Sequence, residues 1–131
     1  METNYFGIFL AELRRKNKLK QKQVAYEAGL DSSYVAALEN GRRPPPRQNL
    51  VQKLANAVKA DEWDEKELGR TAMLSQLARP LDEYAEFFSG APTALAILEL
   101  SSVLSERELQ AISTLIDSFR YRTYAQGRNK M

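Results

Sequence analysis

The sequence contains neither cysteine nor histidine. Without cysteine, the chain has no disulfide, no thiolate nucleophile and no cysteine-based metal site. Without histidine, it lacks the commonest catalytic base and metal ligand. The sequence also has no carboxylates spaced as a metal-binding loop and no glycine-rich phosphate loop. We therefore expect that the protein is not an enzyme and that it needs no metal and no cofactor.

Long apolar runs are absent as well. The longest, from Ala94 to Leu98, is far shorter than the roughly 20 residues that cross a bilayer. The first residues show no basic segment followed by an apolar one, as an export signal would. We expect a soluble cytoplasmic protein. Hydrophobic residues make up 44% of the 131 residues, which is enough for the packed core of one domain or of a small domain with an appendage.

Charge is distributed unevenly along the chain, although the net charge is only +2. Residues 1–60 hold 11 Lys and Arg against 5 Asp and Glu, residues 61–117 hold 4 against 12, and residues 118–131 hold 4 against none. A basic first half suits a polyanionic partner, and the acidic block that follows would be repelled by the same partner. The two halves are therefore expected to have different tasks.

Residues 21–38, QKQVAYEAGLDSSYVAAL, have the pattern of two short helices that cross at a tight turn. Ala25 is small enough to let the second helix pass close to the first. Gly29 can adopt the positive φ that ends the first helix and redirects the chain. The apolar positions expected to fix the crossing are Val24, Ala28, Leu30, Val35 and Leu38.

The rest of the chain is predicted to be helical. Expected helices cover about 3–17, 21–28, 32–39 and 48–60, and three prolines make 42–47 an extended loop. Asp61 suits the N-cap of a fifth helix that fades near Leu77. Pro80 is expected to open a sixth helix ending by residues 89–90, and Pro92 a seventh. Ser105 and Glu108 have the spacing of a capping box for a last helix that reaches about residue 124.

The stretch from Leu10 to Leu68 resembles the lambda-repressor-like, or Xre/Cro-type, helix-turn-helix DNA-binding family. The resemblance rests on LAELRRKNKLKQKQVAYEAGLDSSYVAALENGRR and QNLVQKLANAV, and it covers a little under half of the chain. It implies an all-α fold, with a five-helix DNA-binding domain in residues 1–78. Residues 79–131 are then a helical C-terminal region, for which we expect a role in dimerisation.

The resemblance also implies roles for individual residues. Positions on the 32–39 helix that face base edges correspond to Ser32, Ser33, Ala36 and Ala37. Positions expected at the DNA phosphates or backbone correspond to Gln21, Lys20, Lys22, Tyr34, Asn40, Arg42, Arg43 and Arg47. For Tyr34 a phosphate bond and simple surface packing stay open, as do phosphate contact and plain solvation for the basic residues 14–22.

The sequence departs from the family pattern in two places. Lys20 replaces the usual Thr or Ser before the glutamine of the second helix, so the N-cap hydroxyl is lost. The base-facing set holds two serines and two alanines, with no Arg, Asn or Gln for bidentate reading of a base. Specificity is then expected to come largely from DNA shape or from residues outside this helix.

These features predict a sequence-specific DNA-binding transcriptional regulator: a homodimeric repressor that reads a palindromic operator and is nucleoid-associated when bound. The predicted dimer interface is the apolar stripe of the last helix, made of Leu109, Ile112, Ile116 and Phe119. The alternative is an antitoxin-type or other protein-interaction regulator whose acidic C-terminal half binds a separate protein. A small-molecule effector stays open, and so do the operator sequence, the regulated genes and the sign of regulation.

Overall fold

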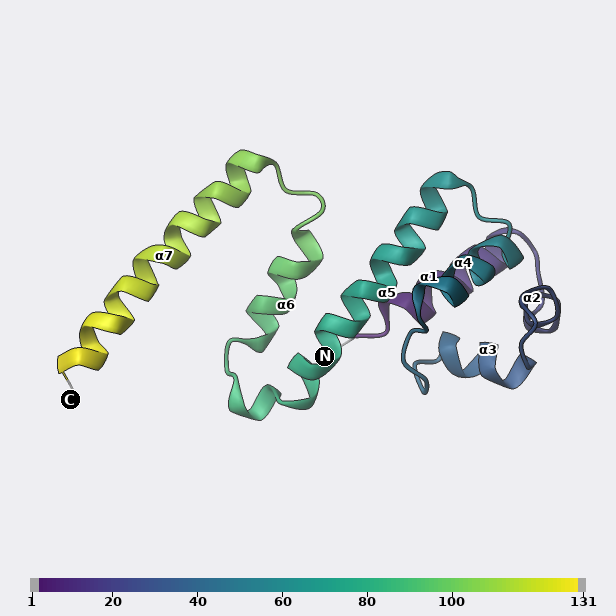
Figure 1. The fold of residues 1–131 in the computed structure, drawn as a ribbon, viewed down its shortest axis with the longest axis horizontal. Coiled ribbons are helices and arrows are strands. Elements are labelled where there is room, and N and C mark those ends of the chain that lie inside the picture. Colours follow the sequence, from purple (N-terminus) through teal and green to yellow (C-terminus); the bar gives the residue numbers. More distant parts are fainter. Residues whose placement is uncertain (1–2, 130–131) are drawn as a thin grey trace. The chain divides into compact units, whose positions relative to one another are not determined.

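The computed structural model describes the backbone of residues 3–129 and the side chains of residues 3–122 (Figure 1). Within them, all regular structure is helical, which confirms the predicted all-α class. The α-helices are α1 Tyr5–Lys16, α2 Gln21–Ala28, α3 Ser32–Glu39, α4 Gln48–Ala57, α5 Glu62–Glu83, α6 Ala91–Leu100 and α7 Glu106–Asn129, and a 3₁₀ turn, η1, covers Ala85–Phe87.

The chain divides into two compact units, residues 1–95 and residues 96–131. The assignment of residues 1–78 to DNA binding and of 79–131 to dimerisation stays a prediction. None of the helices in the described part of the chain is both long and apolar enough to cross a membrane.

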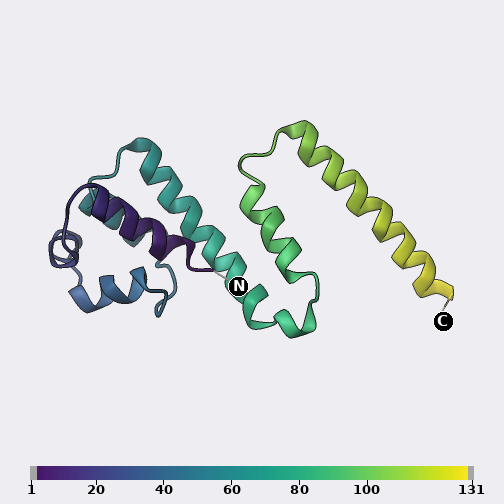
Figure 2. The ribbon, with the colours of Figure 1, turned by 180° about the vertical axis from the view of Figure 1, so that it is seen from behind.

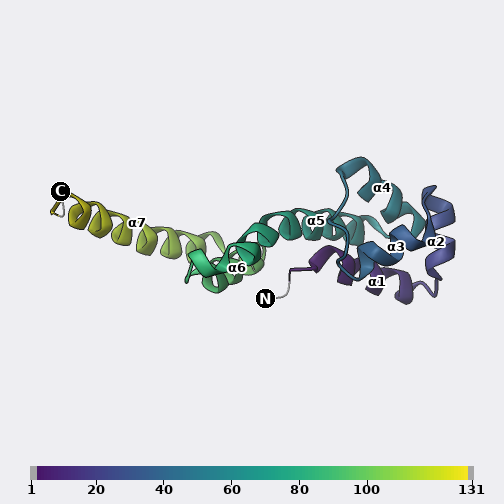
Figure 3. The same ribbon diagram turned by 90° about the horizontal axis from the view of Figure 1, so that it is seen from below.

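The first unit is built on the predicted crossing of α2 and α3. Gly29 ends α2 with a φ of 70°, and the N–H of Leu30 then donates to the carbonyl of Ala25 at 2.8 Å. Val24 and Val35 are completely buried at the crossing. α4 packs on α2, and α5 packs on both α1 and α4, as the views from behind and from below show (Figures 2 and 3). The result is one continuous apolar core beneath α3.

α1 lies unusually close to the end of α3. A Cβ added at Gly7 would run into the backbone carbonyl of Leu38 and would lie 2.5 Å from Oδ1 of Asn4. The N–H of Phe6, in the unsatisfied first turn of α1, donates to Oγ of Ser75 on α5 at 3.0 Å. Helix α1 is therefore fixed against both α3 and α5, and this holds the two crossing helices in place.

In the first unit, the predicted helix ends differ from the structure at three places. α4 stops at Ala57 because Lys59 adopts a φ of 59°, which helices exclude. α5 does not fade near Leu77, and Pro80 does not begin a new helix, because α5 continues through it to Glu83. Pro80 is exposed and its carbonyl still accepts the N–H of Tyr84 at 3.0 Å, while Ala78 is completely buried. Packing on the proline's N-terminal side thus outweighs the one hydrogen bond that proline cannot donate.

The second unit is dominated by α7. The predicted capping box is present: the Ser105 N–H donates to Oε1 of Glu108 at 3.0 Å, and the Glu108 N–H donates to Oγ of Ser105 at 3.2 Å. The helical backbone runs to Asn129, beyond the expected end near residue 124. At the end of the first unit, Pro92 lies in the first turn of α6, as predicted.

Candidate nucleic-acid interface

The first turn of α3 is the exposed part of the crossing. Ser32 and Ser33 are exposed, and Ala36 and Ala37 are half-buried one turn later. The other side of α3 carries the buried Val35 and Leu38. The four residues predicted to face bases therefore share the outward side of the second helix, with small side chains only.

An open hollow of about 700 Å³ lies beside this surface. It is lined by residues of the turn before α3, the outward side of α3, the loop that follows α3 and the first turn of α4. Its lining residues are Gly29, Leu30, Asp31, Ser33, Tyr34, Ala37, Arg43 and Leu50. Two of the predicted base-facing residues, Ser33 and Ala37, thus share one hollow with Arg43, while Ser32 and Ala36 do not line it.

The loop that follows α3 is stabilised by hydrogen bonds of its own polar groups and with the end of α3. Oδ1 of Asn40 accepts the N–H of Arg42 at 3.0 Å, and the N–H of Arg43 donates to the carbonyl of Ala37 at 3.2 Å. Gly41 has a φ of 80°, where other residues are strained, and a Cβ there would lie 2.9 Å from Asn4. The Asn40 side chain therefore shapes the turn that presents the two arginines, whatever else it touches.

Gln21 has a partner inside the domain. Its Nε2 donates to Oε1 of Glu39 at 3.0 Å. Glu39 also accepts two hydrogen bonds from Arg14, Nε to Oε2 at 2.7 Å and Nη2 to Oε1 at 2.9 Å, and Arg14 Nη1 donates to the Leu19 carbonyl at 2.9 Å. The hydrogen bond with Glu39 raises the pKa of the Arg14 guanidinium. The predicted phosphate anchor is thus tied to the last turn of α3.

This network was not predicted from the sequence. Arg14 was grouped with the basic residues that could reach a phosphate, but its side chain is only 12% exposed and that of Glu39 only 6%. The two residues lie 25 positions apart and belong to different helices, so no local spacing indicates their pairing. Removing either partner of such a pair would leave an uncompensated charge with little access to solvent, so the pair is expected to act structurally.

The start of α2 lacks an oxygen cap, as the sequence predicts. Lys20 is the N-cap residue and its side chain makes no capping hydrogen bond. Gln23 makes the other hydrogen bond of a capping box, since its Oε1 accepts the N–H of Lys20 at 2.7 Å. Lys20 and Lys22 are both exposed at this end of the helix.

Unpaired cations surround the α3 surface. Arg14, Lys16, Arg70 and Arg79 each form an ion pair with a carboxylate. Among the residues whose side chains are described, no ion pair is found for the cations predicted to contact DNA, which are all exposed: Lys20, Lys22, Arg42, Arg43 and Arg47. Charges without a protein partner remain available for the phosphates of a nucleic acid.

A helix-turn-helix domain model matches residues 6–68. These residues belong to the helix-turn-helix family. The DNA-binding family predicted from the sequence is thereby confirmed. The match ends at Leu68, inside α5, so the domain takes in α1 to α4 and the first turns of α5.

Two similar proteins come from Bacillus subtilis (strain 168). The uncharacterized HTH-type transcriptional regulator RghRB is 41% identical over 54 residues, which are 41% of this chain and 39% of that protein. The HTH-type transcriptional repressor RghR is 37% identical over 54 residues, 41% of this chain and 40% of that protein. The match to these curated relatives thus spans about two fifths of their length. No solved structure matches the chain significantly.

The predicted dimer residues lie along α7. Leu109 and Ile112 are half-buried, while Ile116 and Phe119 are 39% and 46% exposed. Their spacing of three, four and three residues puts them on one side of the helix. One cation also lies against this side of the helix: the guanidinium carbon of Arg122 lies 4.9 Å from the centre of the Phe119 ring.

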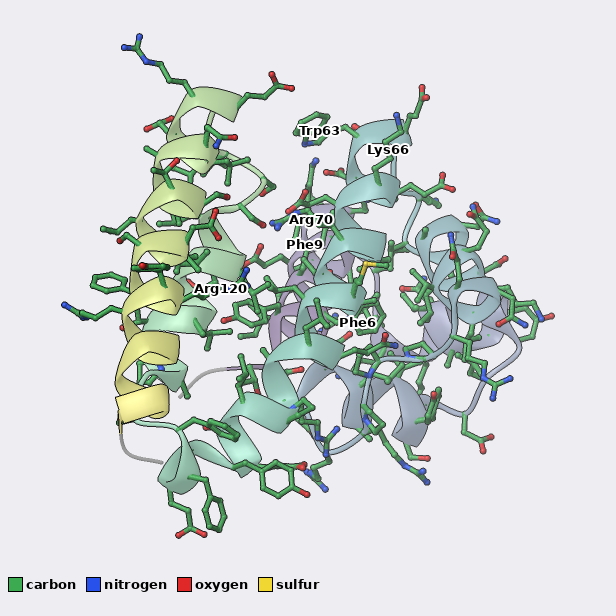
Figure 4. All side chains as sticks on the ribbon, turned by 60° about the vertical axis from the view of Figure 1, so that its left-hand side comes forward. Phe6, Phe9, Trp63, Lys66, Arg70 and Arg120 are labelled. Atoms are coloured by element: carbon green, nitrogen blue, oxygen red, sulfur yellow. The ribbon has the colours of Figure 1, made fainter. Side chains whose placement is uncertain are left out.

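The remainder of the described surface offers no cluster of three or more metal-ligating side chains. Trp63 projects from the first turn of α5 into solvent and is 75% exposed (Figure 4). It lies outside the hollow beside α3.

Proposed function

We propose that this chain is a sequence-specific transcription regulator that binds double-stranded DNA through α3. The observation that carries the proposal is the exposed outward side of α3 together with the exposed cations at the start of α2 and in the loop after α3. Arg14, Lys16 and Arg70 are paired with carboxylates, whereas Lys20, Lys22, Arg42, Arg43 and Arg47 have no ion-pair partner among the described side chains. Exposed cations on both sides of an exposed helix suit phosphates flanking a major groove.

In this proposal each cation has a place on the DNA. Lys20, Lys22 and Gln21 lie at the start of α2, where the helix N–H groups also favour an anion. Tyr34 lies in the first turn of α3, while Asn40, Arg42 and Arg47 follow the helix, and these residues contact the backbone of the duplex. Binding of DNA would then compete with Glu39 for the amide of Gln21, which is bonded to Glu39 at 3.0 Å.

The regulator acts as a homodimeric repressor in this proposal. Repression is suggested by the printed name of RghR, to which the helix-turn-helix region is 37% identical. Dimerisation is suggested by the three-four-three spacing of the apolar residues on α7, which is the spacing of a helix–helix seam. Two copies related by a twofold axis would read a palindromic operator, and linkage of the two weak half-sites supplies the affinity.

Selection of bound duplexes from a random DNA pool tests the proposal directly. The wild-type chain should enrich a palindromic sequence, and its affinity for that sequence should fall steeply with salt. Arg42→Ala should flatten the slope of log K against log salt by about 0.9, since one phosphate contact is lost. Lys66→Ala is the matched control: Lys66 is equally exposed but lies on α5, away from α3. An unselective wild-type chain contradicts the proposal.

The alternative function, an interaction regulator with a separate protein partner, rests on the same helix. Its support is the acidic charge of residues 61–117 together with the exposed apolar side chains of α7. Purification from the native host distinguishes the two. A stoichiometric second protein that displaces the homodimer favours the alternative, and a pure homodimer favours the repressor.

A further inference from the structure

We propose that Arg43, together with Asp31, reads one G·C base pair in each half-site. This inference rests on the proposed DNA-binding function and deepens it, because it assigns sequence selectivity to two residues outside α3. It also gives Arg43 a different role from the phosphate contact that the family resemblance implies.

α3 cannot supply strong base reading by itself. Its outward side chains are two serines and two alanines. A serine offers one hydroxyl, and an alanine offers only a methyl group. Guanine presents two acceptors, O6 and N7, in the major groove, and a guanidinium fork matches both at once. Any strong direct reader of a base must therefore come from a neighbouring segment.

Arg43 is positioned by the fold beside the predicted base-facing residues. Its backbone N–H donates to the carbonyl of Ala37 at 3.2 Å, so the chain returns to α3 just after the helix ends. The left-handed Gly41 and the bond from the Arg42 N–H to Asn40 fix this return. As a result, Arg43 lines the same hollow as Ser33 and Ala37.

The guanidinium of Arg43 is exposed and has no hydrogen bond or ion pair among the described residues. Arg43 also lines a second hollow, of about 250 Å³, with Asp82 and Glu83, but no ion pair joins it to either carboxylate. Glu83 instead lies 3.6 Å from Arg79. The guanidinium of Arg43 is thus available to a ligand in the unbound chain. The guanidinium of Arg14, in contrast, donates two hydrogen bonds to Glu39.

Asp31 decides between a phosphate and a base as the target. Asp31 lines the same hollow as Arg43, and its side chain makes no capping bond to α3. A phosphate in that hollow would be repelled by Asp31. A base pair would not, because cytosine presents its N4 amino group as a donor that a carboxylate accepts. The Arg43 and Asp31 pair therefore matches guanine on one strand and cytosine on the other.

Three variants test the assignment in the selection experiment. Arg43→Lys keeps the charge but loses the fork, so it should retain affinity for random DNA and lose the preference for G·C at one position. That loss should be about 5- to 150-fold, the discrimination that a bidentate contact provides. Asp31→Asn should reduce the preference at the same position. Arg42→Ala, the neighbouring control, should weaken all sequences equally and leave the preference unchanged.

The outcomes separate this inference from the proposed function. If Arg43→Lys retains the full preference, or if it loses the same factor on every sequence, Arg43 contacts phosphate and the inference is wrong. If the wild-type chain selects no sequence at all, the proposed function fails first. Unchanged melting temperatures of the exposed-loop variants establish that the differences arise in the complex.

Discussion

At the scale of single residues, the space around two helical glycines predicts opposite effects of an alanine substitution on the stability of the chain. Gly7→Ala should destabilise the chain by about 1–3 kcal/mol, because the new methyl group meets the rigid backbone carbonyl of Leu38. Gly69→Ala should instead stabilise it by about 0.5–1 kcal/mol, since nothing lies within 4 Å of the added Cβ and alanine favours the helix. Urea unfolding of both variants measures the difference. Two changes of equal sign would show that α1 does not approach α3 this closely.

The residues of the crossing could be predicted from the sequence, whereas their polar contacts could not. Val24, Gly29 and Val35 play the predicted roles because local sterics determines them. The partner of Gln21 depends on tertiary packing, since Glu39 reaches it only after α2 and α3 have crossed. Side-chain pairs of this kind have no periodic pattern in the sequence, and the candidate DNA site is therefore predicted in position but not in detail.

At the scale of the helix, the start of α2 is only half capped. Lys20→Thr should complete the capping box, because Gln23 already accepts the N–H of residue 20 and threonine would accept the N–H of Gln23. We expect a gain of about 0.5–2 kcal/mol in stability and a loss of DNA affinity. Lys22→Ala, the control, should weaken DNA binding without the gain. Thermal melting and a binding titration check both, and a less stable Lys20→Thr chain would contradict the N-cap assignment.

The start of α7 should respond to acid. The hydrogen bond from the Ser105 N–H, and secondly that with its hydroxyl, hold the pKa of Glu108 below the ordinary glutamate value. A lowered folded-state pKa means that the stabilisation is complete above the ordinary value and is lost as the pH falls through the lowered one.

The amide shift of Ser105 in an NMR titration should therefore move with the titration of Glu108. In Glu108→Gln this step should disappear while the helix start persists, because the amide oxygen still accepts the bond. A step that survives in Glu108→Gln would belong to another group.

The helix boundaries show where tertiary packing outweighs the local sequence signals for a helix start or end. Ser105 and Glu108 predicted the start of α7 correctly, since a capping box acts over four residues. Pro80 did not end a helix, because the residues before it pack on the core and the carbonyl of Pro80 still accepts a bond. A proline therefore indicates a helix start only where neighbouring packing does not oppose it.

At the scale of the whole molecule, the opposite charges of the two halves fit two tasks. The basic residues 1–60 contain the α3 surface, and the acidic residues 61–117 include all of α5 and α6 and the first half of α7. Repulsion between the acidic half and DNA would orient the first unit with α3 toward the duplex. If the chain is the homodimer that we propose, its affinity for an operator also depends on the contact between the two copies, which lies outside the DNA-binding residues.

The dimer prediction is tested on α7. Ile116→Asp places a carboxylate in the proposed seam, where an unpaired charge costs about 3–5 kcal/mol. It should convert the dimer to a monomer whose first unit remains folded but binds a palindromic operator far more weakly. Ser118→Asp adds the same charge on the other side of the helix and should remain dimeric, because Ser118 lies about 200° around from Ile116.

Sedimentation and operator binding measured on both variants show whether the dimer forms through the apolar side of α7. Loss of the dimer in Ile116→Asp alone places the seam on the apolar side of α7. If both variants stay dimeric, the twofold contact lies on another surface of the chain. If the wild-type chain is itself monomeric at every concentration, the exposed apolar residues of α7 are covered by a different protein, and the interaction regulator becomes the better function.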